Sequence, residues 1–430
     1  MARLLAYNSP TPGHVFPSAG LLLELHRRGH EVHLRTQATQ VERFRNLGWH
    51  SEAVDSGIEA IELEDWSART QIEAQKRLLD FYLARARLEI RDLQRAIEQV
   101  QPDALIVDVQ TEGAGYVAEA SRLPWAMYCP YPPAFRSSDA PPFGLGLAPA
   151  RTLLGRGRDL LLHAYGDRLL APHVAARNVM REELGLVPLQ RYEDQWHKPH
   201  RFLALTAEPY EFHRTDWPTN VRLVGPIAWE PDLEPPEWVL DEKRPIILVT
   251  ASTAYQHDEK LISTALKAFA TEDVALIVTT AAIDPRGFAT PPDTRVEQFL
   301  PHGPIIDRAA CVICHGGQGT TQKTLAAGVP VCVVPFCRDQ FDVARRVEYA
   351  SAGVKLHHKR LDPVRLRSAV REAITHRAGA ERVARAFAQA GGASSAATSI
   401  EELLSEAPNR TGERAIAQRS PQTLNPNSTV

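Results

Sequence analysis

A run of glycines and hydroxyl residues stands between an apolar strand and a helix in the second half of the chain. Residues 311–321 read CVICHGGQGTT, so His315 ends the strand and three glycines follow within four positions. Glycines let a backbone approach a bulky anion without Cβ clashes, and the next helix offers unpaired N–H groups and the positive end of its dipole. The pattern favours binding of a phosphorylated ligand, although such a turn is also typical of a plain helix cap.

The elements after this turn place it in a larger unit. Residues 321–329 have helical spacing and stop at glycine and proline, and residues 331–334 (VCVV) indicate a buried parallel strand. A second polar loop, residues 335–340 (PFCRDQ), then opens another helix. Loops of this kind lie at the carboxyl edge of open α/β sheets, where ligands bind. We therefore expect the two loops to share one site.

His14 is the reactive side chain nearest the N-terminus. It follows a predicted strand, 4–7, and stands at the mouth of a helix predicted over 16–29. A helix N-terminus disfavours a positive charge, so a neutral imidazole there could accept a proton. A histidine in an ordinary turn would have the same neighbours, so this residue alone leaves both interpretations open.

These motifs together resemble the family-1 glycosyltransferases of the GT-B fold, especially the bacterial macrolide and natural-product enzymes. The likeness covers nearly the whole chain and is densest over residues 296–350 and 4–33, where residues 12–14 (PGH) and 28–32 (RGHEV) match the family's N-terminal motif. It implies an α/β fold of two Rossmann-like, doubly wound domains that face each other across a cleft. Asp342 stands where many relatives carry asparagine, and His302 where plant relatives carry glutamine.

The resemblance also implies roles for particular residues. His14 would be the catalytic base, and Asp108, at the end of the predicted strand 104–107, would accept the imidazole N–H and fix its tautomer. A helix cap is the ordinary alternative for Asp108. The residues that would bind the donor sugar nucleotide are Ser252, Thr253, Phe299, Pro301, His302, His315, Gly317, Gly319, Thr320, Asp339 and Gln340. Asp339 would also suit a helix N-cap.

A loop rich in proline and aromatic residues follows the predicted strand 125–128. Its residues 131–135 (YPPAF) and 141–146 (PPFGLG) could line an apolar acceptor cavity or serve as a rigid connector. Its position at a strand end favours the acceptor role, for which we single out Tyr131, Phe135 and Phe143.

The order of predicted elements indicates two domains. We expect an acceptor-binding domain over residues 1–224, a proline-rich linker over 225–243, a donor-binding domain over 244–406 and a disordered tail over 407–430. Strands are predicted at 4–7, 31–35, 104–107, 125–128, 246–250, 274–279, 295–298, 310–314 and 331–334. Residues 61–100 have the spacing of two amphipathic helices, partly a crossover and partly a lid.

Composition excludes several functions. A formal net charge of −3 over 430 residues gives no basic field for nucleic acid or an anionic membrane. Cys311 and Cys314 would point to opposite faces of one strand, which disfavours a metal site. The chain lacks the Asp-x-Asp pair with which other transferases hold a divalent ion, so metal-independent chemistry without a cofactor is expected. We see no signal peptide or membrane span and expect a cytoplasmic protein, with a homodimer as an option.

The sequence thus predicts an inverting, metal-independent glycosyltransferase that moves a sugar from a UDP- or dTDP-sugar to a hydroxyl of a small lipophilic acceptor. One rival hypothesis is a catalytically silent GT-B protein that stabilises a partner transferase, which would not need to keep both His14 and Asp108. A dinucleotide-dependent oxidoreductase is disfavoured because no Gly-x-Gly-x-x-Gly turn follows the first strand. The acceptor, the sugar and the base stay open.

Overall fold

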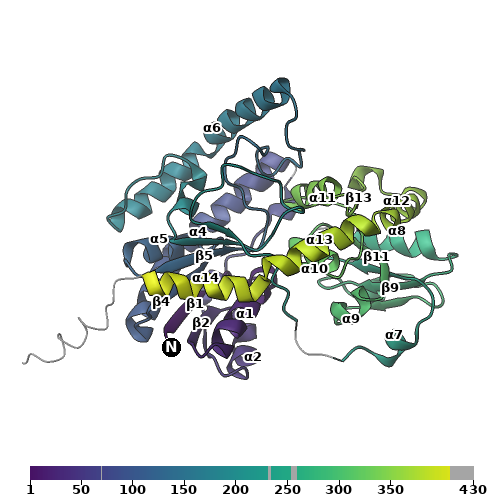
Figure 1. The fold of residues 1–430 in the computed structure, drawn as a ribbon, viewed down its shortest axis with the longest axis horizontal. Helices are drawn as coiled ribbons and strands as arrows, with labels where there is room; N and C mark the ends of the chain where they lie inside the picture. Colours follow the sequence, from purple (N-terminus) through teal and green to yellow (C-terminus); the bar gives the residue numbers. More distant parts are fainter. Residues whose placement is uncertain (69, 231–233, 253–258, 407–430) are drawn as a thin grey trace, which may run out of the picture.

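Two parallel sheets organise the chain (Figure 1). The computed structural model describes residues 1–430 except 69, 231–233, 253–258 and 407–430, so the expected tail lies outside the described residues. The first sheet has the order β3-β2-β1-β4-β5-β6-β7 and the second the order β10-β9-β8-β11-β12-β13. In each sheet the order reverses direction next to the first strand, which creates the switch point where open α/β sheets bind ligands.

The strands of the first sheet are β1 Arg3–Tyr7, β2 Glu31–Thr36, β3 His50–Ala53, β4 Ala104–Asp108, β5 Trp125–Cys129, β6 Arg201–Ala204 and β7 Val221–Leu223. Those of the second are β8 Ile246–Thr250, β9 Ala275–Thr279, β10 Arg295–Glu297, β11 Ala309–Cys314, β12 Val331–Val333 and β13 Gly353–Lys355. Central strands such as β4, β5 and β8 are buried throughout, in keeping with their mainly apolar sequences.

The helices are α1 Pro12–Arg27, α2 Val41–Arg45, α3 Ser56–Glu59, α4 Gln71–Val100, α5 Glu112–Ala120, α6 Leu153–Glu183, α7 Glu237–Asp241, α8 Glu259–Phe269, α9 His302–Ile306, α10 Gln318–Ala326, α11 Gln340–Tyr349, α12 Pro363–Thr375, α13 Arg377–Ala390 and α14 Gly392–Glu406. The 3₁₀ turns are η1 Ala38–Gln40, η2 Asp65–Ser67, η3 Tyr192–His197, η4 Pro285–Gly287 and η5 His358–Arg360. Among the described residues, no helix is both long and apolar enough to cross a membrane.

Several elements differ from the sequence-based prediction. All nine predicted strands exist, but the short strands β3, β6, β7 and β13 were not predicted because three or four residues carry little pattern. Residues 71–100 form one helix rather than part of two, since no glycine or proline interrupts them and the Thr70 hydroxyl caps their start. Helix α1 begins at Pro12, which brings His14 into its first turn.

Helix α14, at the end of the predicted second domain, packs against the first domain. Its residues Ala396, Ile400 and Leu403 are buried in the same core cluster as Leu22 of α1. Figure 1 shows α14 lying beside α1 and the first sheet, far from the strands of the second. The chain after residue 391 therefore belongs by its packing to the first domain, because the apolar face of α14 finds its partner there. The predicted linker also contains a short helix, α7.

Candidate active site

His14 and Asp108 form a hydrogen-bonded pair at the carboxyl edge of the first sheet. His14 Nδ1 lies 2.9 Å from Asp108 Oδ1 and 3.0 Å from Oδ2. Asp108 ends β4 and is fully buried, whereas the His14 side chain, in the first turn of α1, keeps 11% of its surface exposed. The two residues are 94 positions apart in the chain, and the pairing of β1 with β4 brings them together.

The Asp108 carboxylate is held by further donors. Its Oδ2 accepts from the Tyr128 hydroxyl at 2.8 Å and the Ser9 backbone N–H at 3.1 Å, and its Oδ1 accepts from the Gln110 N–H at 2.9 Å. Burial alone would raise the pKa of Asp108, but the charge and hydrogen bond of His14, with the bonds from Gln110 and Tyr128, lower it below its usual range. Asp108 is therefore a fixed anion.

This arrangement sets the tautomer of His14. An ionised carboxylate only accepts hydrogen bonds, so Nδ1 carries the proton toward Asp108 and a neutral ring leaves Nε2 as an acceptor. No described residue forms a hydrogen bond to Nε2. The pair can thus remove a proton from a ligand, with Asp108 stabilising the cation that forms.

Of the three predicted acceptor residues, Tyr131 lies near this pair and Phe143 lies next to Tyr131. The Tyr131 ring centroid is 6.0 Å from that of His14 and 6.2 Å from that of Phe143, and Phe143 is 38% exposed. Phe135, by contrast, is buried in the core and packs edge-on against Trp196 and Phe202. Its predicted role as an acceptor contact is therefore wrong, because its ring faces the sheet rather than the site.

The glycine-rich turn opens α10 without a side-chain cap. Gly316 has φ +98°, and Gly317 is the N-cap residue, whose lack of a side chain leaves the first turn uncapped. No acidic residue stands in that turn. Gly319 is exposed, and a Cβ built on it would meet nothing within 4 Å. With Thr320 beside it, this helix end has the features of an anion site.

His315 stands directly behind the turn. A Cβ on Gly317 would lie 2.6 Å from His315 Nε2, so the ring packs tightly against this backbone. Burial, together with the charge of Arg338, lowers the pKa of His315 to about 4, while a hydrogen bond with the Thr250 backbone opposes the shift. The Nδ1 atom is buried without a well-aligned hydrogen bond to a described residue. His315 is thus a neutral polar group.

The predicted base-binding loop surrounds α9. Phe299 is 61% exposed, whereas Pro301, the N-cap of α9, is buried. His302 Nε2 lies 2.9 Å from the Thr279 hydroxyl, and burial lowers the pKa of His302 to about 4. Glu230, from the linker, accepts from the Gly303 N–H at 3.2 Å and forms an ion pair with Lys323 of α10. This ion pair ties the linker to α10.

The loop before α11 is fixed from within. Gln340 is buried, and its Oε1 accepts from the N–H groups of Phe336 and Cys337 at 2.8 and 3.1 Å. Asp339 is half-buried and makes no side-chain N-cap bond, unlike the predicted cap. Burial raises the pKa of Asp339, while charges that include His14 lower it, so Asp339 and His14 lie within electrostatic range across the two domains.

The sequence did not reveal the contacts that bring the two domains together. Arg338 reaches Asp65 of the first domain with two hydrogen bonds of 2.6 Å. In the core of the interface, Arg346 of α11 donates to Glu211 at 2.7 and 2.8 Å. Tyr210 donates to Gln318, the first residue of α10, at 2.8 Å. The partners in these contacts are between 108 and 273 positions apart and share no local pattern, so only the fold identifies these pairs.

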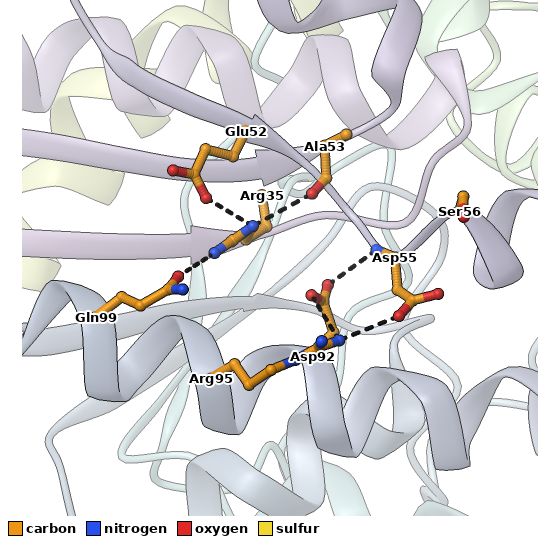
Figure 2. Close-up of a pocket in the computed structure, with 8 residues that line it drawn as sticks. All are labelled: Arg35, Glu52, Ala53, Asp55, Ser56, Asp92, Arg95 and Gln99. Carbon is orange, nitrogen blue, oxygen red and sulfur yellow. Dashed lines mark hydrogen bonds and ion pairs between the residues drawn. The ribbon is translucent and has the colours of Figure 1, made fainter.

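Two predicted donor contacts, Ser252 and Thr253, and one polar pocket remain to be placed relative to this site. Ser252 is buried just after β8, and Thr253 lies outside the described residues. A pocket of about 280 Å³ lies between β2, β3 and α4. Figure 2 shows its lining, in which Arg35, Asp55 and Arg95 are engaged in ion pairs. None of the predicted site residues lines it, so this polar recess is separate from the His14 site.

Comparison with known proteins decides the family. The chain is 31% identical over 393 residues to 4'-demethylrebeccamycin synthase of Lentzea aerocolonigenes, covering 86% of this chain and 91% of the relative. The chain belongs to the natural-product glycosyltransferases. The C-terminal half of this glycosyltransferase also matches the family model described as "Erythromycin biosynthesis protein CIII-like, C-terminal domain", over residues 263–403.

Solved structures agree on the fold of the glycosyltransferase. The crystal structure of CalG4, the calicheamicin glycosyltransferase, superimposes with a TM-score of 0.73 at 23% identity, covering 95% of this chain and all of the other. Glycosyltransferase SsfS6 from Streptomyces sp. SF2575, complexed with thymidine diphosphate, superimposes with a TM-score of 0.62 at 19% identity, covering 95% and 100% of the two chains. The predicted GT-B fold of two Rossmann-like domains is confirmed.

Proposed function

We propose that this glycosyltransferase is an inverting, metal-independent enzyme that transfers a sugar from a nucleoside diphosphate donor to a hydroxyl of a small lipophilic acceptor. His14 is its general base. The observation that carries this proposal is the hydrogen-bonded pair of His14 and a buried, ionised Asp108, which leaves Nε2 of a partly exposed imidazole as the acceptor.

In the proposed reaction, His14 Nε2 takes the proton of the acceptor hydroxyl as its oxygen attacks the anomeric carbon. The diphosphate leaves from the opposite face, so the configuration at that carbon inverts. Asp108 stabilises the imidazolium formed at His14, and Tyr128 and two backbone N–H groups keep Asp108 in place. Each of these groups is fixed before substrate arrives, which limits the reorganisation required in the transition state.

The leaving diphosphate needs stabilisation that does not depend on a metal ion. We assign this role to the uncapped first turn of α10, where Gly317, Gly319 and Thr320 lie, together with the neutral His315. Asp339 and Gln340 face the sugar in this assignment, and Phe299, Pro301 and His302 surround the base. In this assignment Ser252, just after β8, contacts the diphosphate; Thr253, predicted for the same role, lies outside the described residues.

A structural relative and the rings near His14 support the proposed donor and acceptor classes. SsfS6, which shares the fold, is complexed with thymidine diphosphate, so dTDP-sugars are the first donors to test, ahead of UDP-sugars. Tyr131 lies beside His14, and the exposed Phe143 lies beside Tyr131, so the two aromatic rings suit a lipophilic acceptor. None of the five cysteines forms a disulfide in the part of the chain that the structure describes, which supports a reducing, cytoplasmic setting.

The decisive experiment is mass-spectrometric detection of sugar transfer from dTDP- and UDP-sugars to a panel of phenolic and macrolide acceptors. We expect sugar adducts with the parent enzyme and their loss in His14→Ala. His26→Ala, on the same helix but outside the site, is the matched control and should retain activity. Binding of dTDP, followed by protein fluorescence, should persist in His14→Ala. Equal activity of the two variants would refute the base assignment.

A further inference from the structure

Three potential metal ligands gather on strands β2 and β3, on the first sheet's edge strand and its neighbour. Glu31 opens β2 and His33 stands two residues later, so both point to the same face of the sheet. His50 opens β3, and the strand register places it directly beside His33. Among the described residues, this is the one group of three or more histidine, cysteine or carboxylate side chains whose ligand atoms lie within 4.8 Å of one another.

Both imidazoles converge on one carboxylate oxygen. His33 Nε2 lies 2.7 Å from Glu31 Oε1, and His50 Nε2 lies 3.9 Å from the same atom. The two rings are stacked, with centroids 4.5 Å apart and planes at 16°. Ligand atoms around a tetrahedral zinc ion lie roughly 3.3 Å apart. His50 Nε2, at 3.9 Å, must therefore approach Glu31 Oε1, and His33 Nε2, at 2.7 Å, must move away from it, each by roughly half an ångström. His50, whose side chain is 65% exposed, is free to make that movement.

Arg3 holds the Glu31 carboxylate through the oxygen that does not face the histidines. Arg3 Nε donates to Glu31 Oε2 at 3.2 Å, and Arg3 Nη1 donates to the Val100 carbonyl at 3.0 Å. Glu31 thus has one oxygen anchored by Arg3 and the other facing two imidazoles, which is how ligating carboxylates are commonly supported.

Neighbouring charges do not oppose a cation strongly. Arg35, next along the same face of β2, is 2.7 Å from Glu52 and donates to Gln99, as Figure 2 shows. Arg3 is partly neutralised by its own contact with Glu31. Both nearby arginines are thus paired with carboxylates, and the two imidazoles and the Glu31 carboxylate remain the groups available to a cation.

We propose that Glu31, His33 and His50 form a binding site for a transition-metal ion of the zinc type. Two imidazole nitrogens and one carboxylate oxygen match the ligand set that zinc takes in proteins, with water as the fourth ligand. Imidazole selects such ions over Mg²⁺, which prefers oxygen ligands. Binding replaces the hydrogen bond between His33 and Glu31 with two bonds to the metal and adds His50 as the third ligand.

This site is independent of sugar transfer. Glu31 and His50 are the first residues of their strands, whereas Asp108 is the last residue of β4, so the proposed metal and the His14 pair belong to different regions of the sheet. A metal bridging β2 and β3 would anchor a four-residue edge strand that has one neighbour in the sheet. We therefore expect it to stabilise the fold and to leave the chemical step unchanged.

The test uses tag-free, full-length protein that has been stripped of metal with a chelator. Titration with Co²⁺ should give the visible absorption bands of tetrahedral coordination at one ion per chain, and Zn²⁺ should displace Co²⁺ and raise the melting temperature. His33→Ala, His50→Ala and Glu31→Gln should each weaken Zn²⁺ binding at least tenfold. Mg²⁺ should have no effect at the same concentration.

The matched control is His357→Ala. It removes one ring of a second histidine pair, His357 and His358, whose centroids are 4.6 Å apart. Among the described residues, this pair belongs to no group of three potential metal ligands. This variant should bind Zn²⁺ like the parent. The proposal is overturned if the parent binds no Zn²⁺ at micromolar concentrations, or if His50→Ala binds it as tightly as the parent. Transfer activity should be equal with and without chelator, so failure of the metal site would leave the proposed enzymatic function untouched.

Discussion

Asp108 and Tyr128 are register partners on the neighbouring strands β4 and β5, and the Tyr128 hydroxyl donates to the same carboxylate that orients His14. The pairing of two strands therefore fixes the third member of the candidate catalytic group. Tyr128 was not predicted as a site residue, although its place at the end of a buried strand next to Asp108 was the available signal.

Asp108→Asn should lower kcat on the order of 10²- to 10⁴-fold, because the amide cannot stabilise the imidazolium and can favour the wrong tautomer of His14. Asp103→Asn is the matched control, since Asp103 precedes the same strand and accepts from the Arg3 N–H at its other end. Steady-state kinetics with a fixed acceptor would measure both. A kcat for Asp108→Asn within twofold of the parent would contradict the assignment.

Tyr128→Phe should keep the fold and lower both stability and rate moderately. Loss of a buried hydrogen bond to a charged group costs about 1.5–3 kcal/mol, but the Ser9 and Gln110 N–H groups still hold Asp108. We expect a reduction of kcat of about tenfold, measured alongside the free energy of unfolding in urea. An unchanged rate with reduced stability would make Tyr128 a purely structural residue.

Gly317 and Gly319 should respond differently to alanine. A Cβ on Gly317 would collide with His315, so Gly317→Ala should lower both the melting temperature and the affinity for dTDP. Gly319 has open space around it, and alanine favours a helix by roughly 0.5–1 kcal/mol. Gly319→Ala should therefore keep or raise the melting temperature while it weakens dTDP binding at least tenfold. Unchanged dTDP affinity in Gly319→Ala would argue against an anion site at α10.

Asp342 should make stability depend on pH. Burial raises its pKa to about 7, with Asp339 adding to the shift, while Arg346 and the N–H of Gly144 oppose it. The folded state then binds more protons than the unfolded state between about pH 4 and 7, so this group's contribution to stability is lost as the pH rises through that window. Asp342→Asn should be more stable than the parent at pH 8, on the order of 2–4 kcal/mol, and equal to it near pH 4. Parallel stability curves for the two proteins would disprove this.

Glu211 should be the carboxylate on which the domain contact depends most. It is fully buried between Arg214 and Arg346, and although burial raises its pKa, these two arginines bring it below its usual range. Removing its charge in Glu211→Gln leaves two buried cations and should cost about 3–5 kcal/mol. Glu183→Gln, in an exposed pair with Arg87, is the control and should unfold like the parent. Similar unfolding free energies for both variants would contradict the buried-pair argument.

Phe143 and Phe135 separate acceptor binding from core packing. Phe143→Ala should raise the KM for a lipophilic acceptor several-fold and leave the melting temperature unchanged, since the ring is 38% exposed. Phe135→Ala should cost about 3–5 kcal/mol of stability because it opens a cavity in the core. An acceptor KM that does not respond to Phe143→Ala would move the acceptor site away from this loop.

The sequence alone determined the parts that rest on local pattern. Apolar runs indicated the central strands. Two helix starts were marked, one by His14 and the other by the glycines at 316, 317 and 319. Such features depend on a few adjacent residues, so the sequence shows them directly. It could not show that Phe135 faces the core, that residues 71–100 form one helix, or that α14 returns to the first domain. Those outcomes depend on which apolar faces meet.

Tertiary structure also decided every contact between distant residues. Asp108 meets His14 and Tyr128 through strand pairing, Arg346 meets Glu211 across 135 positions, and His33 meets His50 through the register of two short strands. Single charged or polar residues have no periodicity, so their partners are chosen only when the sheets form and the two domains pack together. The sequence named the groups capable of chemistry, and the packing of the sheets and domains determined which of them act together.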